Sequence, residues 1–124
     1  MTLRTRRNLD VAMRGEAFAA AKYQRFAAFA RTRGNDQLGD LLGEIADDNR
    51  MNHFAKEIQL AGSVADDASN LQDVIREKLC HIERYRHFAA DAEKDGDVNA
   101  AFLFRTIIAD DGRHLRELEA RRGS

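Results

Sequence analysis

Proline and tryptophan are absent from the sequence, and Cys80 is its only cysteine. Without proline, no position is forced to interrupt a helix. A single cysteine excludes an intrachain disulfide and any metal module built from paired cysteines. What remains is rich in alanine, leucine, arginine and glutamate, and this composition is typical of long helices with solvated faces.

An excess of one charge and long apolar runs are missing as well. The chain has 20 Lys and Arg against 21 Asp and Glu, and its net charge is -1. Because acids and bases are interspersed, we expect no nucleic-acid-binding face. No segment approaches the roughly 18 apolar residues of a membrane span, and the N-terminus has no apolar run of signal length. We therefore expect a soluble, cytoplasmic protein with no nucleic-acid and no membrane partner.

The chain is long enough for one domain, 1–124, and it contains an internal repeat. A shift of 62 positions aligns residues 8–57 with 70–119, and thirteen of these fifty positions are identical. The matches include Tyr23 with Tyr85, Phe26 with Phe88, and Gly34 with Gly96. A repeat of this length indicates a duplicated structural unit, here about 5–62 and 69–121.

Each repeat is expected to form a helical hairpin. Gly34 and Gly96 can adopt the left-handed conformation that ends a helix, and Asn35 or Asp97 can cap the next one. This predicts helices over about 5–33, 36–61, 70–95 and 97–121. Gly62 would end the second helix and Ser69 or Asn70 would cap the third, which leaves a short linker. The fold class is therefore predicted to be all-α.

Residues spaced by alternating threes and fours define the expected buried seam of each helix. The first seam is Leu9, Met13, Glu16, Ala20, Tyr23, Ala27 and Ala30. The second is Leu38, Leu41 or Leu42, Ile45, Asn49 and Asn52. The third is Leu71, Val74, Glu77, Cys80 or His81, Tyr85 and Phe88. The fourth is Leu103, Ile107, Asp111, His114 and Leu118. Polar residues interrupt every seam near its middle.

Four such interruptions at one level of a four-helix bundle would face one another. A buried carboxylate must take up a proton or find a cation, and a shared metal ion is one solution. Asp111 and His114 stand three residues apart, so both lie on one face of the fourth helix. Glu16 and Glu77 are the carboxylates expected at the same level.

These residues resemble the rubrerythrin-like branch of the ferritin-like superfamily. The resemblance covers about 8–120, and "RGEAFAAAKYQRFA" and "FAADAEKDG" carry it most specifically. It implies a ferritin-like four-helix bundle whose core binds iron. Carried over by position, Glu16, Glu77, Asp111 and His114 would be the metal ligands, and Tyr23 would support one of them.

The ligand set implied by this resemblance is partly substituted. Where the family has Glu-x-x-His on the second helix, the ungapped alignment places Asn49 and Asn52. His53 stands one position later, about 100° around an α-helix. Cys80 takes the place of another glutamate. Since asparagine is a poor ligand for a transition metal, we expect one or two iron ions, another divalent metal, or none.

Two functions follow. One is a non-haem iron oxidoreductase that reduces peroxide or oxygen with electrons from an external donor, as the resemblance implies. The other is a metal-free or single-metal dimeric helical module for binding or assembly, with a decayed di-iron site. The retained acids and His114 favour the first, and the two asparagines favour the second.

A homodimer is the expected assembly. In the ferritin-like arrangement the second and third helices run parallel, and the linker 62–69 is short for that return path. Exchange of hairpins between two chains would remove this difficulty. Val11, Phe18 and Phe29 form a further apolar stripe off the first seam, which suggests a partner surface.

Overall fold

The computed structural model describes residues 1–122, which are helical apart from short connections, without a strand among them. The helices are α1 (Leu3–Thr32), α2 (Asp36–Asp47), η1 (Asp48–Phe54), α3 (Ala55–Leu60), α4 (Asp67–Lys94) and α5 (Val98–Ala120). η1 is a π-helical segment, and α2, η1 and α3 follow one another without a break. The all-α prediction is confirmed. None of the helices in this range combines the length and hydropathy that crossing a membrane requires.

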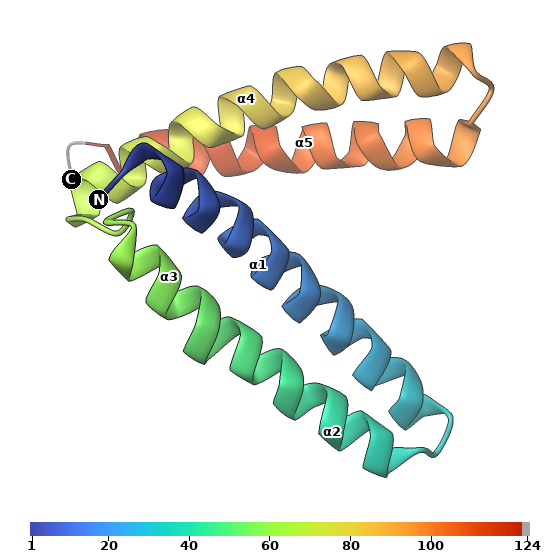
Figure 1. Cartoon of the computed structure of the whole chain (residues 1–124). Coiled ribbons are helices and arrows are strands. Elements are labelled where there is room, and N and C mark those ends of the chain that lie inside the picture. Colours follow the sequence, from blue (N-terminus) through green and yellow to red (C-terminus); the bar gives the residue numbers. More distant parts are fainter. Residues whose placement is uncertain (123–124) are drawn as a thin grey trace. The chain divides into compact units, whose positions relative to one another are not determined.

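Two compact units make up the chain, and each is a helical hairpin (Figure 1). The first unit is Met1–Val64, in which α1 packs against α2, η1 and α3. The second starts at Ala65 and consists of α4 packed against α5. Both tight turns contain the predicted glycine, since φ is 79° at Gly34 and 78° at Gly96. Only glycine adopts this left-handed conformation without strain, which explains why both hairpins turn there.

The caps agree with the prediction in the first hairpin and differ from it in the second. Asn35 caps α2, because its side chain accepts a hydrogen bond from the Leu38 backbone amide at 3.3 Å. The predicted caps Ser69 and Asn70 are wrong. Asp66 caps α4 by accepting from the Ser69 amide at 2.7 Å, so the helix starts at Asp67. Only residues 61–66 then connect α3 to α4.

Replacing Asp66 with alanine should lower the thermal midpoint of unfolding at neutral pH. The hydrogen bonds from Ser69 lower the pKa of the Asp66 carboxyl, so this stabilisation is present above the unfolded-state pKa. It is lost as the pH falls through the lowered, folded-state pKa. The difference in midpoint should therefore narrow in acid. Asp67→Ala is the matched control in the first turn, and an equal effect of both substitutions would contradict the cap assignment.

A narrow seam holds each hairpin together, built mainly from alanines in the first hairpin and from isoleucines and alanines in the second. In α1 the buried residues Ala20, Ala27 and Ala30 belong to the predicted seam, whose other members are half-buried. The predicted second seam is wrong, since Leu38, Leu41 and Ile45 are exposed and α2 buries Gly39 and Ala46.

In α4 the predicted seam is correct at the half-buried Leu71 and Tyr85 and one residue out of register elsewhere. The structure buries Ile75 and Ile82, whereas Val74, Glu77, Cys80, His81 and Phe88 are exposed. The error arose because these residues form a second regular series beside the true one.

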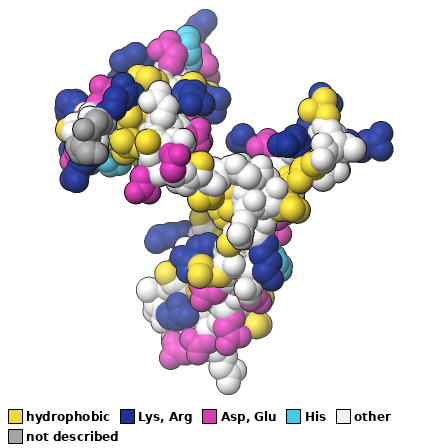
Figure 2. All heavy atoms as spheres, turned by 90° about the vertical axis from the view of Figure 1, so that its left-hand side faces the viewer, with side chains coloured by type: hydrophobic (Ala, Val, Ile, Leu, Met, Phe, Trp, Pro, Cys, Tyr) yellow, Lys and Arg dark blue, Asp and Glu magenta, His cyan; other side chains and the backbone are white. Residues whose placement is uncertain are grey.

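Many large apolar side chains stay at the surface of the hairpins, among charged ones (Figure 2). Leu41 on α2 is 52% exposed, and Leu103, its counterpart in the repeat, is 55% exposed on α5. Phe26 and Phe88 form a second pair of repeat counterparts that are both exposed. No large side chain in the described range is fully buried. A two-helix unit has no further layer with which to cover these residues.

Candidate functional site

The most buried charge of the second hairpin is on Asp111, which is only 6% exposed. Its Oδ1 accepts a hydrogen bond from the Lys78 Nζ at 2.9 Å, from α4 across to α5. His114, one turn further along α5, places its Nδ1 3.4 Å from the same Nζ and 3.8 Å from Asp111 Oδ1. The structure thus brings Asp111 and His114 together, as predicted, but with a lysine between them.

Lys78, the residue after the predicted ligand Glu77, is the side chain of α4 that reaches Asp111. It is the counterpart of Glu16 in the 62-residue repeat, and its side chain faces α5. Glu77, the predicted ligand, is exposed on the neighbouring face of α4. The repeat offset was the signal that could have identified Lys78. Because its ammonium neutralises Asp111, the second hairpin supplies its own cation.

In the first hairpin, Glu16 on α1 lies beside His53 on η1. Glu16 Oε2 and His53 Nδ1 are 3.4 Å apart, and the His53 side chain is the more exposed of the two. A π-helical turn accommodates one additional residue, which rotates the residues after it by about 100° relative to an α-helix. This rotation equals the offset that placed His53 off the seam in the ungapped alignment. η1 therefore gives His53 the place of Asn52 in the alignment, where its exposed side chain reaches Glu16 at the margin of the face that packs on α1.

The substituted positions of this hairpin do not join the Glu16–His53 pair. Asn49 is half-buried, and the exposed Asn52 donates to Asp48 Oδ1 at 2.7 Å. Further along on α3, Glu57 has a buried Oε1 for which residues 1–122 provide no hydrogen-bond partner. Such an atom is costly unless another group reaches it.

The other two predicted residues are Tyr23 and Cys80, and they lie in the first and the second hairpin, respectively. Tyr23 is half-buried, with its ring centroid 6.3 Å from that of Phe26. Cys80 is exposed on α4. Asp111 and His114 lie in the second hairpin and Glu16 in the first, and each of these units has its own ion pair or polar pair.

These donors fit a metal ion poorly in the second hairpin and partly in the first. Around Asp111, a metal would have to displace the Lys78 ammonium, which already satisfies the carboxylate. Glu16 and His53 are a carboxylate and an imidazole, both suitable ligands for iron, but they are only two. In the part of the chain that the structure describes, no three His, Cys, Asp or Glu side chains are grouped closely enough to hold a metal.

Comparisons with profiles of known protein families, with curated proteins and with solved structures found no match to this chain.

Proposed function

We propose that this protein is a helical assembly module whose two hairpins pair through their exposed apolar edges. The observation that carries this proposal is the exposure of Leu41 and Leu103 at equivalent positions of the repeat. Both leucines lie outside the buried seam, and we call the exposed side of each hairpin that carries its leucine the apolar edge. Packing two such edges together would bury both and complete a four-helix bundle.

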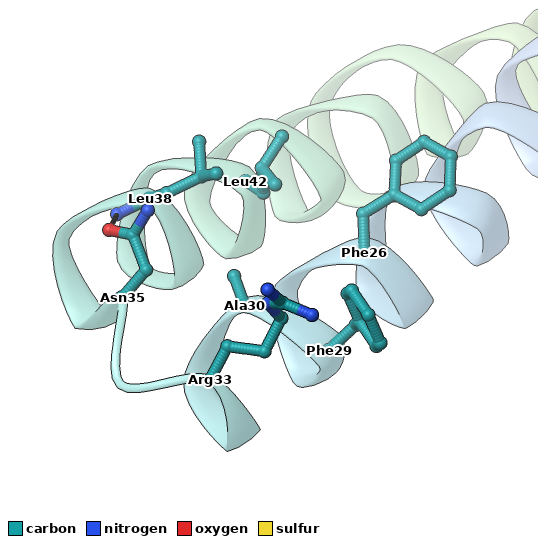
Figure 3. A pocket seen from close by; sticks show the side chains of 7 residues that line it. All are labelled: Phe26, Phe29, Ala30, Arg33, Asn35, Leu38 and Leu42. Atoms are coloured by element: carbon teal, nitrogen blue, oxygen red, sulfur yellow. Dashed lines mark hydrogen bonds between the residues drawn. The ribbon is translucent and has the colours of Figure 1, made fainter.

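A hollow near the turn of the first hairpin offers further apolar surface for such a contact (Figure 3). There Phe26, Phe29 and Ala30 of α1 lie across from Leu38 and Leu42 of α2, around a shallow hollow. The hollow has Arg33 and Asn35 at the turn as its polar margin. Side chains from a second hairpin could fill it without burying a charge.

The ferritin-like arrangement suggested by the sequence fits this proposal best as a homodimer with exchanged hairpins. The rod from Asp36 to Leu60 is about 37 Å long at 1.5 Å per residue. The connection of residues 61–66 spans at most about 20 Å. Residues 61–66 are therefore too short to lead the chain back along the whole length from Leu60 to Asp36, as parallel packing of α4 beside these helices in one chain would require. Hairpins from two chains can pair without such a return path.

The assembly module that we propose does not need a metal in its second hairpin. Lys78 provides the positive charge that Asp111 requires, and its ammonium holds α4 to α5. The bundle can therefore form without a bound ion. This is the metal-free form of the module with a decayed di-iron site.

A second candidate function is a rubrerythrin-like non-haem iron protein, which the Glu16–His53 pair favours. Glu16 and His53 would hold one ion, and a further ligand would have to come from a facing hairpin. Bound iron would supply electron transfer to peroxide or oxygen, with electrons from an external donor. Asp111 and His114 could bind iron in such a protein only if the Lys78 ammonium moved away from Asp111.

Elemental analysis after growth with iron, manganese and zinc separates the two functions. The assembly module is expected to carry clearly substoichiometric metal. The iron protein would carry at least one equivalent, lost in His53→Ala and kept in His81→Ala, a matched control at an exposed histidine of α4. Stoichiometric iron with this dependence would replace the first proposal by the second.

A further inference from the structure

The outer face of α1, opposite its alanine seam, combines basic and apolar side chains. Nine residues of α1 define this face, and at 100° per residue they lie within an arc of about 80° around the helix axis. They are Arg4, Arg7, Val11, Arg14, Phe18, Lys22, Arg25, Phe29 and Thr32, and all are exposed. We call these residues the α1 outer face. It contains no acid, and Asp10, which pairs with Arg14 at 3.1 Å, lies beside it.

The net charge of the whole chain is near zero, although its basic residues are concentrated in the N-terminal part. Residues 1–33 contain eight Lys and Arg but only two acids, Asp10 and Glu16. The remaining residues contain twelve Lys and Arg and nineteen Asp and Glu. The N-terminal helix is therefore cationic, whereas the rest of the chain is acidic. This local excess is what a charge average misses.

Phe18 and Phe29 are unusually exposed for phenylalanine, at 68% and 63%. Their rings are flanked by cations, with Lys22 Nζ 5.2 Å from the centroid of Phe18 and Arg33 Cζ 5.4 Å from that of Phe29. Together with Val11 they point in one direction along about 27 Å of helix, from Val11 to Phe29. All three side chains of such a straight row can enter a flat apolar layer at the same time.

We propose that the α1 outer face docks on an anionic lipid surface. Its phenylalanines would enter the boundary between headgroups and acyl chains, while the basic side chains reach lipid phosphates. Anionic lipid matches both properties of the face, its positive charge and its projecting apolar row. Membrane-surface helices lie parallel to the bilayer and need no membrane-spanning segment.

Other anionic partners match only one of these properties. Single-stranded nucleic acid is bound in grooves where bases stack on aromatic faces, whereas this row stands on a convex helix. The acidic residues of α2, Asp36, Asp40, Glu44 and Asp47, could attract the α1 outer face of a second copy. That acidic row has no apolar side chain to receive Phe18 or Phe29, because Leu38 and Leu41 belong to another side of α2.

The absence of tryptophan allows a direct test with the full-length protein. Phe18→Trp gives one fluorophore in the α1 outer face, and Phe102→Trp gives a control at a 73% exposed position of α5. With vesicles of phosphatidylcholine and phosphatidylglycerol, the emission of the Phe18→Trp variant should shift to the blue and be quenched by brominated acyl chains. The Phe102→Trp variant should show neither response, and phosphatidylcholine vesicles alone should affect neither variant.

Flotation with the same vesicles measures the contributions of the two residue types. Phe18→Ser with Phe29→Ser should weaken binding at least tenfold, and so should Arg7→Gln with Arg25→Gln. The matched controls, Val98→Ser with Phe102→Ser and Arg84→Gln with Arg86→Gln, should bind as the wild type does. Circular dichroism should show unchanged helix content, because every substituted residue is exposed.

Three results would overturn the proposal. One is the absence of phenylalanine-dependent binding to phosphatidylglycerol vesicles. Another is tighter binding to an oligonucleotide than to vesicles, which would favour nucleic acid. The third is a fall in self-association of the Phe18→Ser variant in sedimentation, which would assign the face to a second copy. Phe29 stays unchanged in this variant, because it also lines the hollow of the first hairpin.

Discussion

Asp111→Leu should lower the free energy of unfolding by about 2–4 kcal/mol, because it leaves the Lys78 ammonium without its partner. The expected loss is below that for a fully buried pair, since the Lys78 side chain is 24% exposed. Lys78→Met should also destabilise the protein, because the Asp111 carboxylate is then buried and unpaired. Chemical denaturation of both single variants measures these losses.

The double variant distinguishes an ion pair from two separate packing effects. Lys78→Met with Asp111→Leu should recover most of the stability, since two apolar side chains of similar size replace the pair. Asp110→Leu is the matched control on the same helix. Asp110 forms only a surface pair with Arg113, so about 0.5 kcal/mol or less is expected. Additive losses in the double variant would show that Lys78 and Asp111 do not interact.

Leu41→Glu with Leu103→Glu should raise the dissociation constant of the proposed dimer at least a hundredfold. Each glutamate would place a carboxylate in an apolar contact, and this costs several kcal/mol unless a partner is found. Both substitutions should leave the fold of each hairpin intact, because the two leucines are exposed there. Sedimentation velocity measures the dissociation.

The control for the apolar edges is a pair of substitutions on outward faces. Val11→Glu with Phe102→Glu introduces the same charges at exposed positions of α1 and α5. This variant should remain as associated as the wild type. Equal association of the Leu41, Leu103 variant and the wild type would mean that the edges are not the interface.

Helix content, both glycine turns and the α1 seam were predictable because local rules and long-range packing agree there. Gly34 and Gly96 satisfy a backbone requirement, and the α1 seam has one consistent series of small side chains. In α4, two apolar series compete, and the buried one contains Ile75 and Ile82. Choosing between them requires the packing partner, which periodicity does not provide.

The candidate site could be predicted only in part, for two physical reasons. Asp111 and His114 are one turn apart on a regular helix, so their proximity follows from spacing alone. The position of His53 depends on η1, and a π-helical turn has no sequence period that an alignment without gaps could detect. Lys78 was missed because a carboxylate was expected at that level, although the repeat aligns Lys78 with Glu16.

The central claim is that exposed hairpin edges drive an assembly that needs no metal ion. Sedimentation equilibrium of the full-length protein, after treatment with a chelator and over a range of concentrations, tests it most directly. We expect twice the mass of one chain, with the helix content of the untreated protein. A monomer, or a dimer that dissociates when metal is removed, would contradict the claim.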